Sequence, residues 1–572
     1  MEHINFAQDS TLSTKKRVRR VALACIPCRS RKVCNRCQYD EKVCEYQKSR
    51  RGGRPRKQPP SNCSVERVEN ETSISHRRTS PTSSTEGTGD AQELASQPSM
   101  IPSIGSYLAE SHVEQLLAQF YTYFHAAHPC VLPRWSLEAR MGTDSALSEH
   151  LLPVLLYIGS IFMHSIDSEP LADAALQAIE YGRSYSGIPN PYHVQAILLY
   201  SITVYWCNAP QIGRMYLDEA IEAAFLLGMH RKEFASQYGY GDSVLEESWR
   251  RTWWQIHVTD VHISGSTHTY EGLSTKFPIT TELPCEELNY ERGEIPQPLT
   301  LKQYENREFC DIEFSSFAQL IGFSQGITKV LAFARLDDLV GVQALCVSAD
   351  TMMTAWFSLL PPSKKSLLGD DGKVDEILFK AMIVMQTCIV DLHRRLSSLL
   401  YSPVESASLC APPPPTANDI IKEEARMHTA KILCATEKLN TLLTLPTRFA
   451  THTPFIICMI ANMTIAHLSA CRYIFTEPRL SVEREKIRLN MGVLKMLGEF
   501  WPAGKREYKA VGTIAKAILD LKDEDAKVPE SGLSFDVMDF GFGDGANLDF
   551  SWCDELGAVD ARFFDDTATL SF

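Results

Sequence analysis

Five cysteines near the beginning of the sequence have the spacing of a metal site. Four of them form two C-x-x-C pairs, which lets their thiolates share one soft ion with the tetrahedral geometry of zinc. The eleven cysteines after Cys63 lie at uneven intervals, which fits reduced thiols in an intracellular protein better than a secreted disulfide framework. The spacing therefore predicts a zinc site at Cys25, Cys28, Cys34 and Cys37, and Cys44 follows them closely in the sequence.

The charge of the chain is divided unevenly along its length. The 572 residues include 57 Lys and Arg against 70 Asp and Glu, and the net charge of −13 by itself disfavours nucleic acid as a partner. Between Lys15 and Lys57, however, sixteen basic residues stand against three acids. This asymmetry indicates that the cysteine-rich end binds nucleic acid, while the remainder of the chain is acidic.

Composition divides the chain into segments of different character. From Gln58 to about Ser106 the chain is rich in Ser, Thr, Pro, Glu and Gln, and this segment cannot bury enough apolar surface to fold, which predicts a disordered linker. Beyond it, apolar residues recur at helical spacing with few strand patterns, so the fold class is mainly α with a large all-helical domain. The predicted segments are a basic arm (1–20), the cysteine module with its basic extension (21–57), the linker (58–107), the helical domain (108–525) and an acidic tail (526–572).

The helical domain begins with an amphipathic pattern. Its first helix places Val113, Leu116, Leu117, Phe120 and Phe124 on one face. A Pro-containing loop region interrupts the pattern at 277–300, and a run of prolines does so at 412–415. Further helices are predicted at 148–165, 191–208, 211–228, 243–262, 309–338, 342–360, 373–400, 420–444, 454–476, 483–500 and 508–522.

Two helix boundaries have specific signals. Gly228 is placed to end the helix at 211–228 as a left-handed cap. Ser243, with Glu246 three residues later, predicts a capping box at the start of the helix at 243–262.

One stretch is long enough to cross a membrane, because no charged residue lies between Arg448 and Arg472. It contains Pro454, Asn462 and two histidines, and amphipathic helical segments lie on both sides of it. These features favour a buried core helix over a membrane span. The first residues contain no apolar segment of the signal-peptide type, so neither a secretory signal nor a membrane partner is expected.

The tail combines acidic and aromatic residues. Residues 531–572 contain nine acids, one Arg, seven Phe and one Trp. Acidic residues between bulky aromatics are typical of disordered activation segments that bind transcriptional co-activators. The alternative is a solvated tail without a specific role, but such a tail would have no reason to hold eight large aromatic side chains in water.

The cysteine module resembles the DNA-binding module of fungal zinc-cluster transcription factors, in which six cysteines hold two zinc ions. The matching pieces are Ala24-Cys25-x-x-Cys28-Arg29-x-Arg31-Lys32, Cys34-x-x-Cys37 and Cys44-x-Tyr46. The family has a further cysteine between its basic run and the second C-x-x-C pair, whereas here Val33 directly precedes Cys34. The resemblance implies two zinc ions with Cys25, Cys28, Cys34, Cys37 and Cys44 as ligands, and this chain is one thiolate short of the family's set.

Three explanations of the shortage stay open. In the first explanation, the gene model omits a short segment between Val33 and Cys34, which the matching sequence on both sides of this junction favours. A water molecule or the more distant Cys63 would instead complete the cluster. In the third explanation, a single zinc ion is held by the two C-x-x-C pairs alone.

The resemblance also assigns roles to basic residues. It implies that Arg31 and Lys32 read a CGG triplet in the major groove, since Arg and Lys donate to guanine O6 and N7. Arg29 and Arg36 would then contact phosphates, as side chains that fix the orientation of a protein on DNA do. The alternative is that all four basic residues are non-specific phosphate contacts.

Basic runs flank the module on both sides. The run from Lys15 to Arg20 and the run from Arg50 to Lys57 both suit nuclear import or phosphate binding. The second run includes Gly-Arg-Pro-Arg and is similar to an AT-hook core, which enters a narrow A·T minor groove. Its candidate DNA contacts are Arg54, Arg56 and Lys57, although nuclear import is the role that the composition favours.

The helical domain extends the resemblance. The segments Gly213–Arg231 and Glu247–Trp254 are similar to the middle regulatory domain of these factors, which implies a domain that restrains or tunes activation, with a metabolite as one signal. The residues themselves predict that Trp249 and Trp253 belong to the core and that Arg250 and Arg251 form a charged face.

Taken together, these patterns predict a zinc-dependent, sequence-specific transcription factor that is located in the nucleus and activates RNA polymerase II promoters with CGG-type sites. Double-stranded DNA is its expected partner, and metabolic or secondary-metabolite genes are its expected targets. The alternative is a regulatory protein whose degenerate module no longer binds DNA specifically. No apolar heptad follows the basic module, so monomer and homodimer both stay open. No enzyme is predicted, because no phosphate-binding loop, zinc-protease motif, nucleophile elbow or Rossmann glycine pattern occurs.

Overall fold

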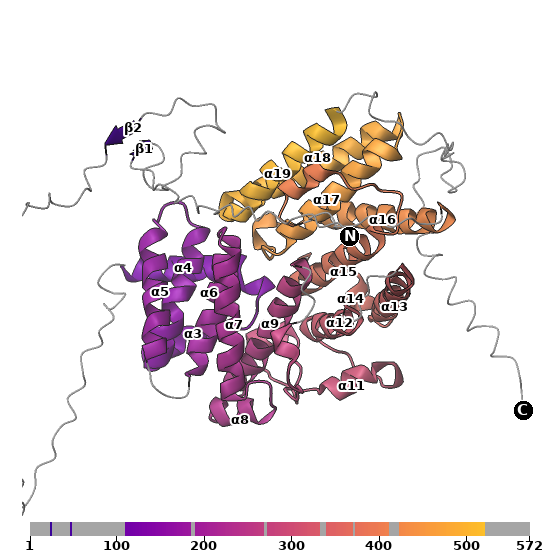
Figure 1. Cartoon of the computed structure of the whole chain (residues 1–572). Helices are drawn as coiled ribbons and strands as arrows, with labels where there is room; N and C mark the ends of the chain where they lie inside the picture. Colours follow the sequence, from indigo (N-terminus) through magenta and orange to yellow (C-terminus); the bar gives the residue numbers. More distant parts are fainter. Residues whose placement is uncertain are drawn as a thin grey trace, which may run out of the picture. The chain divides into compact units, whose positions relative to one another are not determined.

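The structure is a computed structural model of the chain, and it separates into two compact units, residues 1–95 and 96–572. In the first unit the described residues form two antiparallel strands, β1 (Leu23–Cys25) and β2 (Tyr46–Lys48). The second unit is built from helices (Figure 1). The described residues are 23–25, 46–48, 109–184, 189–267, 272–331, 339–369, 372–410 and 422–520.

The second unit confirms a mainly α protein with an all-helical domain. In its first half, α4, α5, α6 and α7 pack beside one another in the purple part of Figure 1. The helices of this half are α2 (Glu110–Tyr123), α3 (Arg134–Arg140), α4 (Leu152–Ile161), α5 (Glu169–Ser184), α6 (Pro191–Trp206), α7 (Pro210–Leu227), α8 (Glu233–Gly239) and α9 (Ser243–Ser266), with the short η3 (His125–Ala127) and the π-helical η4 (Leu147–Leu151).

In the second half, α17 is surrounded by α15, α16, α18 and α19. Helix α12 connects this group to the first half, since it packs on both α9 and α15. The helices are α10 (Glu287–Arg292), α11 (Leu301–Glu305), α12 (Ser316–Leu331), α13 (Leu339–Ser358), α14 (Pro362–Lys365), α15 (Glu376–Arg394), α16 (Lys422–Leu443), α17 (Ile456–Tyr473), α18 (Arg479–Phe500) and α19 (Pro502–Asp520), with short turns at η5 (Leu273–Thr275), η6 (Arg307–Phe309), η7 (Pro403–Ala407) and η8 (Phe449–Thr451).

A single large hydrophobic core extends through both halves, from Leu116 on α2 to Ile518 on α19. Trp249 and Trp253 are buried in it, as the sequence predicted. Burial of such large aromatic side chains makes a major contribution to the stability of a core. Because one core serves both halves, we treat the helical unit as one domain.

The two specific boundary predictions had different outcomes. Helix α7 ends at Leu227, and Gly228 follows it with φ of 79°, in the left-handed region where glycine has no steric penalty. The capping box at Ser243 was wrong: Asp242 is the N-cap of α9, and its carboxylate accepts from the backbone N–H groups of Val244 and Leu245. Asp is as good a cap as Ser, and it stands one position earlier.

The predicted long helices exist, although several boundaries moved. The largest shift is at the segment predicted as 309–338, where α12 begins only at Ser316. Short helices were missed because one or two turns contain too few apolar positions to show a period. Helix α5 was also missed, since much of its buried face is alanine and the pattern is therefore weak. The missed helices are α3, α5, α8, α10, α11 and α14.

The stretch without charges forms α17, which is long and apolar enough to span a membrane by length and composition alone. Within the helical domain, 83% of the residues of α17 are buried. The prediction of a buried core helix is thereby confirmed.

One pair of cysteines departs from the prediction of reduced thiols. Cys410 and Cys458 form a disulfide, although 48 positions separate them in the sequence. Their spacing did not indicate the pair, because tertiary packing brings Cys410 to the first turn of α17. In the helical domain, the described cysteines outside this disulfide are Cys130, Cys207, Cys285, Cys310, Cys346, Cys388, Cys434 and Cys471.

Glu483 on α18 should make the stability of the domain depend on acidic pH. Burial alone would raise the pKa of Glu483, but a hydrogen bond with His467 at 2.9 Å and the charges of Lys486 and Arg479 lower it to about 2. The stabilisation is complete above the unfolded pKa of about 4.3 and is lost as the pH falls towards 2. Glu483→Gln should therefore cost on the order of 2–3 kcal/mol at neutral pH.

Urea denaturation between pH 2.5 and pH 7 tests this effect of Glu483. The variant should show a flatter dependence of unfolding free energy on pH than the unmodified protein. Glu485→Gln is the matched control, since Glu485 lies on the same helix with its side chain 69% exposed. Equal pH profiles for Glu483→Gln and the unmodified protein would contradict the assignment.

Candidate functional site

The cysteine module is described only at its two ends. Strands β1 and β2 pair so that Cys25 lies opposite Tyr46 and Leu23 opposite Lys48. This ladder pairs the backbone that ends at Cys25, the first predicted ligand, with the segment that follows Cys44 in the sequence. The other predicted ligands and DNA contacts lie outside the described residues, namely Cys28, Cys34, Cys37, Cys44, Arg29, Arg31, Lys32, Arg36, Arg54, Arg56 and Lys57, as do the predicted linker and acidic tail.

The helical domain contains a cavity that the sequence did not indicate. It lies between α6, α9, α12, α15 and the start of α17, and the space outside the protein atoms there is about 870 Å³, a volume that includes open solvent. Five helices distant in sequence contribute to its wall, so no local pattern could have predicted it. The lining is Trp206, Val261, His262, Gly265, Ser266, Ile327, Val384, Thr387, Cys388, Asp391, Leu392, Cys410, Phe455, Cys458, Met459 and Asn462.

The cavity is mostly apolar, with a few polar groups. Phe455 packs edge-on against Trp206 at 5.2 Å and against His262 at 5.6 Å between ring centroids. Elsewhere in the lining, the side-chain amide of Asn462 donates to the carboxylate of Asp391. A predominantly apolar cavity with a small number of oriented polar groups is the usual form of a small-molecule site.

Next to the cavity lies Lys380, which is fully buried on α15. Its ammonium nitrogen is 5.4 Å from the centroid of the Phe455 ring. Burial lowers the pKa of Lys380 to about 7. A sequence signal for this residue did exist, because Lys380 is the single charged position in the apolar segment 377–385.

The prediction of a charged face at Arg250 and Arg251 was wrong, since both side chains are buried. Glu247, one helical turn earlier, accepts from Nε of Arg250 and from Nε of Arg251, each at 2.9 Å. Arg251 also donates to Glu287 on α10 at 2.6 Å and to the carbonyl of Cys285 at 2.8 Å. The chain after α9 folds back over this side of the helix and covers charges that an isolated helix would expose to solvent.

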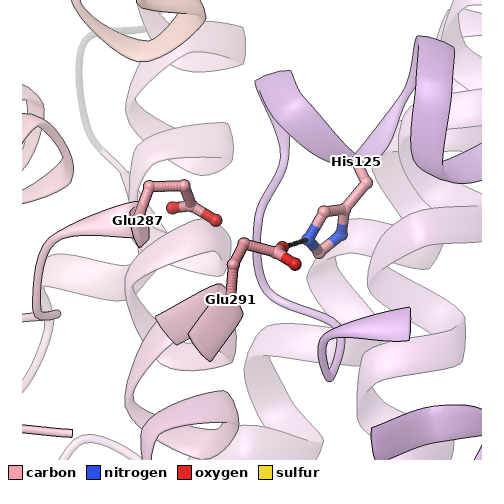
Figure 2. Close-up of side chains that lie close together, drawn as sticks. All are labelled: His125, Glu287 and Glu291. Carbon is pink, nitrogen blue, oxygen red and sulfur yellow. Dashed lines mark ion pairs between the residues drawn. The ribbon is translucent and has the colours of Figure 1, made fainter. Parts of the chain in front are cut away.

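Three side chains beside this network could form a metal site by proximity. His125, Glu287 and Glu291 place potential ligand atoms within 4.8 Å of one another (Figure 2). However, Glu287 already forms an ion pair with Arg251, and the guanidinium would repel a bound cation. His125 lies 3.5 Å from Glu291, and its interaction lowers the pKa of Glu291 despite burial. We therefore assign this group to structural ion pairing.

Comparison with known proteins connects the helical domain to transcription. Residues 99–357 match the family model described as the fungal specific transcription factor domain. A protein of Pestalotiopsis fici named "C6 finger domain transcription factor iacK" is 28% identical over 555 residues, covering 88% of this chain and 81% of its own length. No solved structure matches.

The two matches differ in extent. The family model covers α2 to α12 and most of α13, whereas the relative extends over most of the chain. The cavity therefore has walls from within the family match, through α6, α9 and α12, and from beyond it, through α15 and α17. These comparisons support a fungal-specific regulatory domain in the middle of the chain and, for the protein, a transcription factor.

Proposed function

We propose that the protein is a zinc-dependent transcription factor that binds DNA sequence-specifically in the nucleus and activates RNA polymerase II promoters with CGG-type sites. The observation that carries the proposal is the pair of C-x-x-C motifs inside a strongly basic segment, on the same chain as the regulatory domain. The relative's name, which specifies a C6 finger, is consistent with zinc as the metal. Transcriptional regulation is therefore a better explanation of the chain than catalysis.

The ligand count decides how many zinc ions this chain can hold. Two tetrahedral ions have eight coordination positions, which six thiolates fill when two of them bridge. The five thiolates of Cys25, Cys28, Cys34, Cys37 and Cys44 leave one position for water, for Cys63 or for a ligand in a segment absent from this sequence. We propose that Arg31 and Lys32 contact DNA bases and that Arg29 and Arg36 contact DNA phosphates. Further contacts with phosphates or with the minor groove would come from Arg54, Arg56 and Lys57.

Zinc content and DNA preference together test the proposed function. The full-length protein should carry zinc in native mass spectrometry and should bind a CGG probe more tightly than a scrambled duplex. Cys28→Ser should lower the zinc content and remove the preference for CGG, because a structural zinc site holds its module folded. The preference lost should be about 100-fold or more, since specific sites commonly exceed non-specific ones by this amount.

Cys310→Ser is the control, because Cys310 is an exposed free cysteine in the helical domain. It should leave both zinc content and DNA preference unchanged. Sequencing the cDNA across Val33 and Cys34 shows whether the sixth cysteine exists. One zinc ion or none, with equal affinity for both duplexes, would instead support a regulatory protein that has lost specific DNA binding.

Activation by the acidic tail is tested separately. Removal of residues 531–572 should lower reporter activation by about tenfold, because the aromatic residues that bind co-activators are lost. DNA affinity should not change, since the basic module remains. A variant with the eight Phe and Trp residues replaced by Ser keeps the acidic charge and serves as the matched comparison. Full activation in both variants would show that the tail has no specific role.

A further inference from the structure

Two hydrogen-bonding side chains in the cavity wall have no partner. His262 on α9 is 7% exposed, and among the described residues neither of its ring nitrogens has a hydrogen-bond partner. Nε1 of Trp206 on α6 is equally unpartnered within the described part of the chain, and this side chain is 1% exposed. An unsatisfied buried polar group costs about 1–3 kcal/mol, and a ligand in the cavity that supplied acceptors to both side chains would remove this cost.

The electrostatic environment of this wall favours an anion. Burial, followed by the charge of Lys380, lowers the pKa of His262 well below its ordinary value, so the ring is neutral and donates one N–H. Lys380 itself has no hydrogen bond or ion pair with any described residue. The acidic side chain in the lining, Asp391, is already bonded by Asn462. Trp206 and His262 both pack against Phe455, so a negative group in the cavity that reached both side chains would gain an indole N–H, an imidazole N–H and an uncompensated amine.

The remainder of the cavity suits an apolar body. Val261, Ile327, Val384, Leu392 and Met459 are part of its lining. These side chains come from α9, α12, α15 and α17, so a bound molecule would touch all four helices at once. A ligand with a hydrophobic body and one charged end would fill such a cavity and satisfy its polar groups.

We propose that this cavity binds an apolar carboxylic acid, whose carboxylate accepts hydrogen bonds from Trp206 and His262 and lies within the field of Lys380. The hydrocarbon or aromatic body lies among the apolar side chains of α9, α12, α15 and α17. The site lies in the helical domain and does not depend on zinc or DNA.

Two probes with the same fluorophore test the proposal on the full-length protein without DNA. Dansylglycine carries a carboxylate, whereas dansylamide is neutral, and both increase their emission when they enter an apolar site. Dansylglycine should bind saturably at one site per chain, at least about fivefold more tightly than dansylamide, as expected for a charge-assisted hydrogen bond.

Three variants identify the site. Trp206→Phe keeps most of the aromatic volume and should lower the affinity for dansylglycine by about three- to tenfold, which corresponds to the loss of one hydrogen bond. Lys380→Met should remove most of the preference for dansylglycine over dansylamide. Val384→Phe fills part of the cavity and should lower the affinity for both probes by about tenfold or more, because the apolar dansyl group no longer fits.

Trp253→Phe is the matched control for Trp206→Phe. Trp253 also has a fully buried indole N–H without a partner among the described residues, but it lies outside the cavity lining. Its replacement should leave both affinities within about twofold of the unmodified protein. Circular dichroism and thermal unfolding of each variant confirm that it is folded before titration.

Three outcomes would overturn the proposal. Binding that does not saturate would exclude a defined site, and equal affinity for both probes would exclude a carboxylate. Unchanged binding in Val384→Phe would place the probe elsewhere in the molecule. Each of these results would leave the proposed DNA-binding function intact, because DNA preference is measured separately and without the probes.

Discussion

Lys380→Met is expected to stabilise the protein by as much as about 4 kcal/mol at or below pH 7, where the buried amine is charged. The pKa of Lys380 is about 7 in the folded state, against about 10.4 in an unfolded chain. Between these values the unfolded state binds more protons, so the stability of the unmodified protein rises with pH. The gain from methionine should therefore shrink as the pH rises from 7 to 10.

Urea denaturation at several pH values measures this gain. The change of the gain with pH distinguishes removal of a charge from improved packing, which does not depend on pH. Lys495→Met is the control, because Lys495 is exposed on α18 and its replacement should change stability by less than about 0.5 kcal/mol. A Lys380→Met variant that is less stable than the unmodified protein at pH 7 would show that the amine has a stabilising partner.

Arg251→Met is expected to have the opposite effect and to destabilise the domain by about 3–5 kcal/mol. The guanidinium bonds Glu247 and Glu287, donates to the carbonyls of Pro129 and Cys285, and stacks over Tyr290 at 4.0 Å. Methionine would leave these acceptors without their donor in a buried region. The loss should appear as a lower urea midpoint with an unchanged slope.

Two further variants check the interpretation of Arg251. Arg251→Lys should recover only a small part of the loss, because an ammonium cannot reproduce the planar set of donors. Arg488→Met removes an ion pair whose two side chains are 66% and 69% exposed, and exposed pairs contribute little to stability. A loss for Arg251→Met as small as that for Arg488→Met would contradict the role of this network.

Lys380 and Arg251 show why burial alone does not give the sign of a mutation. Both cations are fully buried. Arg251 has two carboxylates and two carbonyls as acceptors, so its desolvation is compensated. Lys380 has no acceptor among the described residues, which leaves its desolvation uncompensated. A side chain that costs stability and lies beside a mostly apolar cavity is consistent with a functional role.

Much of the helical architecture could be predicted from local patterns. The apolar phase of α7 and its glycine cap at Gly228 are encoded within a few turns of chain, and the structure confirms both. The predicted start of α9 at Ser243 is correct, but its N-cap was misplaced by one residue, because Asp242 and Ser243 are both good caps and the local sequence does not separate them. Short helices were missed because their form depends on the surfaces against which they pack.

The candidate sites also differ in how far the local sequence predicts them. A zinc site is predicted from cysteines close together in the chain, so their spacing alone carries the chemistry. The pattern Glu247 to Arg251, by contrast, is typical of an exposed ion pair on a helix. The segment around Cys285 and α10 covers this pair, and that long-range packing changes a surface pair into a buried network.

The sequence by itself determined the mainly α class, the buried nature of α17, the core positions of Trp249 and Trp253, and a zinc-site prediction from the cysteine spacing. Each of these follows from patterns among residues that lie close together in the sequence. The tertiary structure alone decided the cavity, the Cys410–Cys458 disulfide and the opposite environments of Lys380 and Arg251. These features depend on which distant segments meet, and burial of the shared core, rather than any local pattern, selects those contacts.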